Sequence, residues 1–256
     1  MLVEERRQLI LKWIMDEDSV SLEELEKRLN VTLMTIRRDL GCLQQQGYIK
    51  RVRGGAVKVV KDFFYQMRGN TRKNIYLEEK IRIARYAVQH FVNENDIIVL
   101  EGGTTVSSMG PYLNIDNLTI MTNGLNIISI LSKFMDKIEL ISCGGVLYEK
   151  EMILTGNIAE DFFKKFRAHK CFFGAIALNI EDGALECNLP VIGVKKAMVD
   201  CAKERILLID SSKFGVSSLM PAVPLEKIDI VVTDEKAPQD IVDSLRSFDI
   251  EVHIAD

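Results

Sequence analysis

Two adjacent arginines, Arg37 and Arg38, stand in a stretch of helical spacing that also holds Met34 and Thr35. An arginine guanidinium pairs bidentately with the edge of guanine or with a phosphate, and a threonine hydroxyl reaches a base or a backbone oxygen. The opposite, apolar side of the same stretch is formed by Leu33, Ile36 and Leu40. The spacing therefore predicts an amphipathic helix that shows DNA-reading side chains on its polar face.

The charge around these arginines differs from that of the rest of the chain. Between Val31 and Lys61 seven basic residues face a single acid, Asp39, which gives this segment +6 in a chain whose net charge is −4. The seven are Arg37, Arg38, Lys50, Arg51, Arg53, Lys58 and Lys61. The remainder must be clearly acidic, so the sequence indicates two parts with different partners.

A second group of residues suits the binding of a small anion. The run Gly102-Gly103-Thr104-Thr105 follows an apolar segment and precedes a helical one, with Ser107 close behind. Glycines let the backbone approach an anion, the first N–H groups of a helix attract it, and hydroxyls add donors. An ordinary strand-to-helix turn would look much the same. Asn123, Gly144-Gly145 and Lys213 follow other apolar runs and favour the site.

The basic segment has the element order of a winged helix-turn-helix. Ser21 and Glu24 form a capping box before a helix at 22–29, and Thr32 caps a helix from about Leu33 to Gln46. Two β-prone runs, 48–52 and 56–60, flank Arg53-Gly54-Gly55 as a hairpin. The predicted DNA-binding residues are Ser21, Thr32, Met34, Thr35, Arg37, Arg38, Lys50, Arg51, Arg53 and Gly54.

The rest of the chain alternates apolar strand-like runs with helical stretches. This pattern predicts an α/β domain with a mostly parallel sheet that is covered on both faces. Ligands bind such sheets beyond the carboxyl ends of the strands, where the polar loops lie. We expect a winged helix-turn-helix at 1–60, a linker at 61–75 and a larger α/β domain for effector sensing and oligomerisation at 76–256.

These motifs resemble those of the DeoR family of transcriptional repressors. The resemblance rests on Thr35-Ile36-Arg37-Arg38-Asp39-Leu40 and Gly54-Gly55-Ala56, and it extends over nearly the whole chain. Arg53 stands where the family usually has histidine. The resemblance implies a sensor domain of sugar-phosphate-isomerase fold that binds a phosphorylated sugar or a related metabolite. With the loops above, it predicts an effector site of Arg72, Lys80, Gly102, Gly103, Thr104, Thr105, Ser107, Asn123, Gly145, Lys195, Asp210 and Lys213.

Two departures from the family pattern concern acids that normally hold sugar hydroxyls. Ile176 stands where the family often has an acidic residue, and Gly193 stands where it usually has glutamate. Glu101, Glu186 or Asp210 are the candidates to replace them.

The expected function is a DNA-binding regulator, most simply a repressor of carbohydrate-metabolism genes, that acts as a dimer or tetramer on double-stranded operator DNA. The alternatives are a sugar-phosphate isomerase with a DNA-binding appendage and a purely structural DNA-binding protein. Ile176 stands where an isomerase would want its acid, so no catalytic residue is predicted.

Other classes of protein are disfavoured. Five scattered cysteines without a C-x-x-C pair and three isolated histidines predict neither a disulfide framework nor a metal site, and no cofactor is expected. A charged N-terminus and the lack of an apolar run of about 18 residues predict a cytoplasmic protein without a membrane span.

Overall fold

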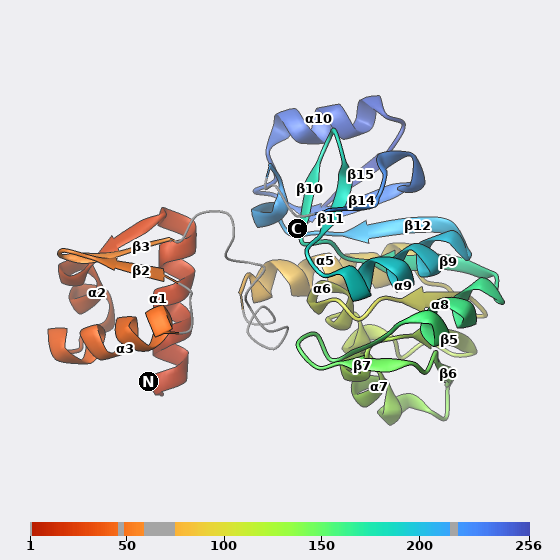
Figure 1. Ribbon diagram of the computed structural model, residues 1–256, viewed down its shortest axis with the longest axis horizontal. Coiled ribbons are helices and arrows are strands. Elements are labelled where there is room, and N and C mark those ends of the chain that lie inside the picture. Colours follow the sequence, from red (N-terminus) through yellow and green to blue (C-terminus); the bar gives the residue numbers. More distant parts are fainter. Residues whose placement is uncertain (1, 46–48, 59–74, 216–219) are drawn as a thin grey trace. The chain divides into compact units, whose positions relative to one another are not determined.

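The computed structural model describes residues 2–45, 49–58, 75–215 and 220–256, which fall into two compact units, Met1–Tyr76 and Leu77–Asp256 (Figure 1). The predicted helix-ending glycine, Gly47, and the linker arginine, Arg72, lie outside the described residues. Ile75 is 5% exposed and belongs to the apolar core of the first unit, which Tyr76 also contacts. The first unit therefore includes a short segment that the sequence pattern assigns to the linker and the second domain.

The described residues of the first unit form three helices and a three-stranded antiparallel sheet. Its elements are α1 (Val3–Glu17), β1 (Ser19–Ser21), α2 (Leu22–Leu29), α3 (Leu33–Gln45), β2 (Ile49–Val52) and β3 (Gly55–Lys58). The strand order is β1-β3-β2, so the predicted hairpin is extended by one short strand. The helices enclose Ile10, Ile14, Leu25, Ile36 and Leu40, each at most 1% exposed. This arrangement confirms the predicted winged helix-turn-helix.

The second unit is an α/β domain. Its first half contains α5 (Leu77–Phe91), β4 (Ile97–Leu100), α6 (Thr104–Ser107), β5 (Leu118–Thr122), α7 (Leu125–Leu131), β6 (Ile138–Ser142), β7 (Val146–Tyr148), β8 (Ile153–Thr155) and α8 (Asn157–Lys164). Its second half contains β9 (Ala168–Phe173), β10 (Ala177–Asn179), β11 (Gly183–Glu186), α9 (Leu189–Asp200), β12 (Ala202–Leu208), β13 (Met220–Val223), β14 (Ile230–Asp234), α10 (Gln239–Ser247) and β15 (Glu251–Ala255). Short 3-10 helices lie at Gly110–Tyr112, Ser132–Phe134, Ser211–Lys213 (η4) and Leu225–Lys227.

Seven strands form one parallel sheet in the order β15-β14-β12-β9-β4-β5-β6. Alternate residues of β4 enter different cores, since Val99 packs with α8 and α9 whereas Ile98 and Leu100 pack with α5 and α7. The sheet is thus buried on both faces, as its continuous apolar strands predicted. The chain runs outward from β4 through β5 to β6 and returns on the other side through β9. The carboxyl ends of β4 and β9 therefore form the switch point at which such sheets bind ligands.

Two smaller sheets accompany the main one. Strands β10, β11 and β13 form an antiparallel sheet in that order, and β7 pairs with β8 as a hairpin. The sequence pattern did not predict either of them. Strand β11 brings Glu186 to the region of the switch point, which makes this addition relevant to the site.

Candidate functional site

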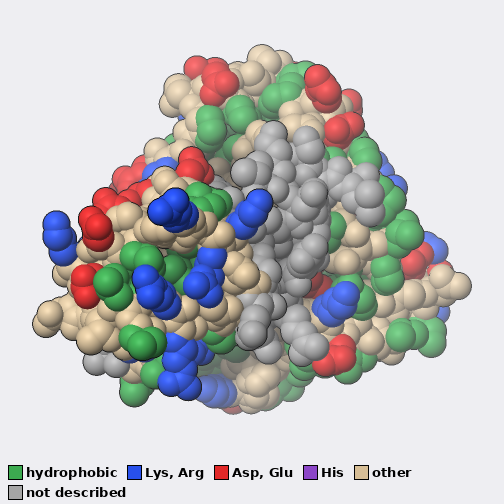
Figure 2. Space-filling model, turned by 60° about the vertical axis from the view of Figure 1, so that its left-hand side comes forward, with side chains coloured by type: hydrophobic (Ala, Val, Ile, Leu, Met, Phe, Trp, Pro, Cys, Tyr) green, Lys and Arg blue, Asp and Glu red, His purple; other side chains and the backbone are tan. Residues whose placement is uncertain are grey.

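Helix α3 presents the predicted DNA-reading side chains to solvent. Arg37 and Arg38 are exposed, Met34 is 79% exposed, and Thr35 is half-buried. The opposite side of α3 is fixed in the core by residues such as Ile36. Figure 2 shows a group of Lys and Arg side chains on the visible face of this unit. The helix therefore has the amphipathic division that a recognition helix needs, with cationic side chains free to reach base edges and phosphates.

The predicted wing contacts are also exposed. Lys50, Arg51 and Arg53 lie on or beside the turn between β2 and β3. The Arg51 backbone N–H donates to Gln44 Oε1 at 3.0 Å, which ties the wing to the end of α3. Gly54 has a φ of +93° and its carbonyl accepts from the Leu22 N–H at 2.8 Å. Gly54 thus shapes the turn and holds it against the start of α2.

Ser21 and Thr32 serve as helix caps. The Ser21 hydroxyl accepts from the Glu24 N–H at 3.1 Å, and Glu24 Oε2 accepts from the Ser21 N–H at the same distance. Thr32 Oγ1 accepts from the Thr35 N–H at 3.4 Å. These bonds confirm both predicted caps and account for the two hydroxyls within the protein, so a DNA contact of either residue stays a prediction.

Asp39, the single acid in the basic segment, fixes the recognition helix. Its side chain is 2% exposed, and it accepts from Arg6 Nε at 2.6 Å and from Arg7 Nε at 3.0 Å. Both arginines belong to α1, so a two-armed ion pair joins α1 to α3. Asp39 does not reduce the charge of the DNA-reading face, because its own charge is matched inside the unit.

Replacing Asp39 by asparagine should destabilise the first unit by about 2–3 kcal/mol, because a buried carboxylate that accepts two charge-assisted hydrogen bonds is lost. Urea unfolding followed by the fluorescence of Trp13, the single tryptophan, measures this loss in the first unit. Glu17→Gln is the matched control, since the Glu17–Arg28 ion pair, with side chains 39% and 34% exposed, lies at the surface and should contribute little. Equal, small effects of the two substitutions would show that the ion pairs of Asp39 with Arg6 and Arg7 do not stabilise the first unit.

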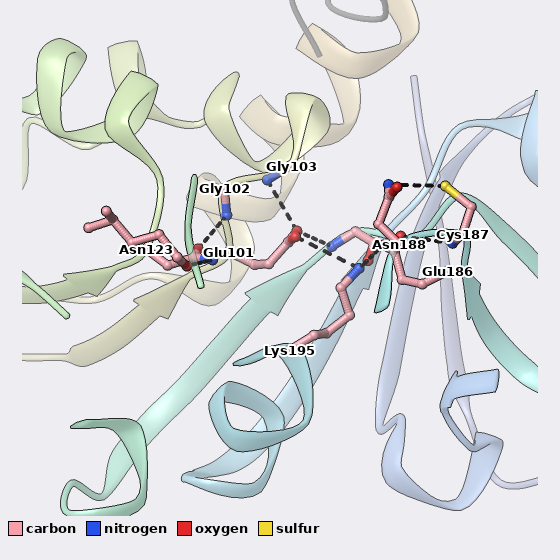
Figure 3. A network of polar contacts seen from close by, with 10 residues as sticks. Glu101, Gly102, Gly103, Asn123, Glu186, Cys187, Asn188 and Lys195 are labelled. Atoms are coloured by element: carbon pink, nitrogen blue, oxygen red, sulfur yellow. Dashed lines mark hydrogen bonds and ion pairs between the residues drawn. The ribbon is translucent and has the colours of Figure 1, made fainter. Parts of the chain in front are cut away.

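A buried ion-pair cluster lies at the switch point (Figure 3). Lys195 of α9 is 1% exposed, and its ammonium donates to a carboxylate oxygen of Glu186 and, at 2.5 Å, to the Gly174 carbonyl. The ammonium also lies 3.7 Å from Glu101 Oε1. Glu101 Oε2 accepts from the backbone N–H groups of Gly103 and Gly174, each at 3.1 Å. Two carboxylates thus share one lysine, which suits contacts with ligand hydroxyls.

Asn123 supports the loop after β4 from within. Its Oδ1 accepts from the Gly102 N–H at 2.9 Å and its Nδ2 donates to the Leu154 carbonyl at 3.2 Å. The residue is fully buried. A Cβ at Gly102 would lie 3.0 Å from the Gly124 Cα, so these neighbouring strand ends are in close contact. In this arrangement Asn123 holds the loop in place and has both ends of its amide engaged.

A second polar cluster follows β12, the strand beyond β9. Asp210 is 1% exposed, accepts from the Ser212 hydroxyl, and has Oδ2 4.0 Å from Nζ of Lys80 on α5. Lys213 of η4 is 7% exposed. Asp210 and Lys213 are therefore buried just after β12, and Lys80 reaches Asp210 from α5.

The remaining predicted effector residues divide into two groups. The hydroxyls of Thr104 and Thr105 make no hydrogen bond to another described residue, and Ser107 Oγ is buried without a partner among the residues described. Gly145 stands apart, two strands from β4. It has a φ of +119°, and a Cβ there would lie 2.6 Å from the Thr155 carbonyl, so its glycine is explained by the packing of the β7–β8 hairpin.

Position 193 does not face the cluster around Lys195. A Cβ on Gly193 would collide with the carboxylate of Glu160 on α8, so a side chain at this position points between α8 and α9. Ile176 is buried at the start of the segment leading to β10, and its N–H donates to the Leu185 carbonyl. Glu101 and Glu186, named above as possible replacements, are the acids that contact Lys195.

Two of the cysteine thiols, those of Cys143 and Cys201, are made unreactive by burial. Burial raises the pKa of Cys143 and of Cys201 to about 11, which keeps both thiols protonated at neutral pH. Within residues 2–45, 49–58, 75–215 and 220–256, no group of three His, Cys, Asp or Glu residues is placed to hold a metal ion. Over the same ranges, no helix combines the length and apolar character needed to cross a membrane.

Comparison with known sequences matches both units to family models. Residues 6–61 match the DeoR-like helix-turn-helix domain, and residues 76–235 match the DeoR C terminal sensor domain. The second match alone covers more than half of the chain. The chain therefore has the domain pair that its sequence motifs predicted.

Relatives align over almost the full length. The HTH-type transcriptional regulator IolR of Bacillus subtilis is 30% identical, with 98% of each chain covered. The Glycerol-3-phosphate regulon repressor of Escherichia coli is 28% identical, again with 98% of each covered. Among solved structures, ribose 5-phosphate isomerase A of Methanocaldococcus jannaschii aligns with a TM-score of 0.40 at 15% identity, over 54% of this chain and 55% of that one. The two sequence relatives are named as regulators, so they give the isomerase alternative no support.

Proposed function

We propose a function for this chain from its site geometry and from its family. The chain belongs to the DeoR family of DNA-binding transcription regulators. It represses genes of carbohydrate metabolism, and a phosphorylated sugar or polyol relieves the repression. The observation that carries the DNA-binding half is the exposed pair Arg37 and Arg38 on a helix whose other side is fixed in the core. The buried cluster around Lys195 at the switch point carries the sensing half.

On DNA, α3 enters the major groove and its N-terminal half reads bases through Arg37, Arg38 and Thr35. Lys50 and Arg53 of the wing contact the phosphate backbone, which positions the unit without reading sequence. We place the regulator in the cytoplasm, where bacterial operators are accessible.

The regulator works as at least a dimer, assembled through residues after Tyr76. A winged helix of this size buries too little DNA surface for a tight monomeric site, and two-fold related reading heads match repeated half-sites. Light scattering of the full chain measures the assembly, and a monomer at the concentration that saturates operator DNA would contradict it.

The ligand binds beyond the carboxyl ends of β4, β9 and β12. Its phosphate lies at Gly103-Thr104-Thr105, where two threonine hydroxyls make no hydrogen bond to other described residues. Its hydroxyls contact the carboxylates of Glu101, Glu186 and Asp210. A phosphorylated polyol is also supported by the relative named for a glycerol-3-phosphate regulon.

Ligand relieves repression only if it binds the DNA-incompetent state more tightly than the DNA-bound state, and operator DNA must then weaken ligand binding by the same factor. Calorimetry of the full chain against sugar phosphates, polyol phosphates and their dephosphorylated forms tests the ligand class. We expect the phosphates to bind about tenfold or more tightly than their neutral counterparts, because charge-assisted hydrogen bonds are lost with the phosphate. Equal affinity within each pair would remove the phosphate from the proposal.

A further inference from the structure

The Glu101 carboxylate lies where two backbone N–H groups converge from different strand ends. Gly103 follows β4 and Gly174 follows β9, and both donate to the same oxygen, Oε2. The Glu101 N–H itself donates to the Phe172 carbonyl at 3.0 Å, which fixes the start of this side chain between the two strands. A pair of converging N–H groups is a donor set for an anion, and here a carboxylate of the chain is bound to it.

Both donors belong to glycines, so neither position has a side chain between its N–H group and the oxygen that accepts from it. A Cβ at position 103 would lie 2.7 Å from Glu101 Oε2, so no side chain fits there beside the carboxylate. A Cβ at position 174 would lie 3.7 Å from the same oxygen. Oε2 thus occupies the place beside both glycines, and a phosphate oxygen can accept from these two N–H groups only when Oε2 leaves it.

Lys195 is in place to receive the displaced carboxylate. Its ammonium lies 3.7 Å from Oε1, the oxygen that makes no hydrogen bond to another described residue. A rotation of the Glu101 side chain that releases both N–H groups can bring the carboxylate onto Lys195. The charge of Glu101 then stays paired inside the cluster while a new anion binds the backbone.

We infer that Glu101 is an intramolecular anion that holds the N–H pair of Gly103 and Gly174 until an anionic ligand displaces it. This inference deepens the function proposed above and rests on it, because it names the residue against which the ligand's phosphate competes. A bound ligand places its phosphate at these two N–H groups in place of the Glu101 carboxylate. The length and charge of residue 101 therefore set the affinity for the ligand, and anions that accept hydrogen bonds weakly do not displace Glu101.

Glu101→Asp tests the inference, because aspartate keeps the negative charge but is one methylene too short to reach both N–H groups. The full chain is titrated calorimetrically with inorganic phosphate, and the Gly103 and Gly174 amides are followed by NMR on glycine-labelled protein. We expect E101D to bind phosphate about tenfold more tightly than the wild type, because the competing charge-assisted hydrogen bonds are absent. Both glycine amide signals should shift on phosphate addition.

Glu186→Asp is the matched control. It shortens the other carboxylate of the cluster by the same methylene, but Glu186 contacts neither the Gly103 nor the Gly174 N–H group in this structure. A gain in E186D equal to that in E101D would overturn the inference, because it would show a general loosening of the cluster. A folded E101D that binds phosphate no better than wild type would overturn it as well.

Should E101D melt at a lower temperature, Glu101→Gln gives a second reading, since glutamine keeps the length and removes the charge. Its phosphate affinity should also exceed that of the wild type, and no gain in E101Q would count against displacement. If the wild type binds sugar phosphates and E101D gains nothing, only this inference fails. If neither wild type nor variants bind any phosphate while operator binding persists, the proposed ligand class fails.

Discussion

A chain in which Arg37 and Arg38 are both replaced by alanine should fold normally and lose nearly all of its sequence-specific DNA binding. Both side chains are exposed on α3, and neither takes part in a hydrogen bond or ion pair with another described residue. Their removal leaves the core side of the helix unchanged, including Ile36 and the ion pair between Asp39 and Arg6. The loss is therefore a loss of contacts to DNA, separate from any loss of stability.

The expected size follows from the contacts that arginine makes in the major groove. Each bidentate base contact is worth about 1–3 kcal/mol, so the double variant should bind its operator about thirtyfold more weakly or worse. An operator is first selected from random-sequence DNA with the wild type. Fluorescence anisotropy then gives the affinity for that operator and for a scrambled duplex, and the ratio of the two should fall towards one.

The wing supplies the matched comparison. Lys50→Ala and Arg53→Ala remove exposed charges that are proposed to touch phosphates, so binding to operator and scrambled duplex should weaken alike. Each substitution should reduce the salt dependence of binding by about one unit of slope. If the Arg37/Arg38 double variant bound its operator like the wild type, or if it showed only the non-specific loss expected of the wing, α3 would not be the reading helix.

The N-terminal fold could be predicted because its signals are local. The Ser21–Glu24 capping box joins residues three apart, and the apolar face of α3 repeats within a few turns. Strand β1 was not predictable in the same way. It is three residues long, and its existence depends on β3, which lies more than thirty residues further along the chain. So short a strand carries no alternation pattern of its own.

The switch-point cluster illustrates a second limit. Strand ends and their polar loops could be read from the sequence, and Lys195 and Glu101 were both named. Their meeting depends on the strand order, which places β9 beside β4 although seventy residues separate Gly103 from Gly174. Glu186 comes from a small sheet without a periodic signal. Asp39 raises the same difficulty, because its partners on α1 are more than thirty residues away.

Replacing Lys195 by methionine should strongly lower the stability of the second unit. Lys195 is 1% exposed and is the ammonium shared by Glu101 and Glu186, both of which are also buried. Without it, two carboxylates remain in a poorly solvated place without their counter-ion. Removing one partner of a buried ion pair costs about 3–5 kcal/mol, whereas replacing both partners by apolar residues is far less damaging.

The double variant K195M/E186L therefore provides the decisive control. If the loss in K195M comes from an uncompensated charge, removing Glu186 as well should restore a large part of the stability, because only Glu101 remains and it still has its two N–H donors. If the loss came only from poorer packing of α9, the second substitution would add to the damage. The charge explanation predicts a large coupling between positions 186 and 195, whereas the packing explanation predicts additive losses and a coupling near zero.

Two spectroscopic signals separate the units in this experiment. Trp13, the single tryptophan, packs against the core of the first unit, so its fluorescence reports on that unit during urea unfolding. Far-UV circular dichroism reports on the helices of both units. We expect K195M to shift the part of the dichroism transition that belongs to the second unit to lower urea, while the Trp13 transition and operator binding change little. A K195M chain as stable as the wild type, or a double variant less stable than K195M, would show that the ammonium does not neutralise the two carboxylates.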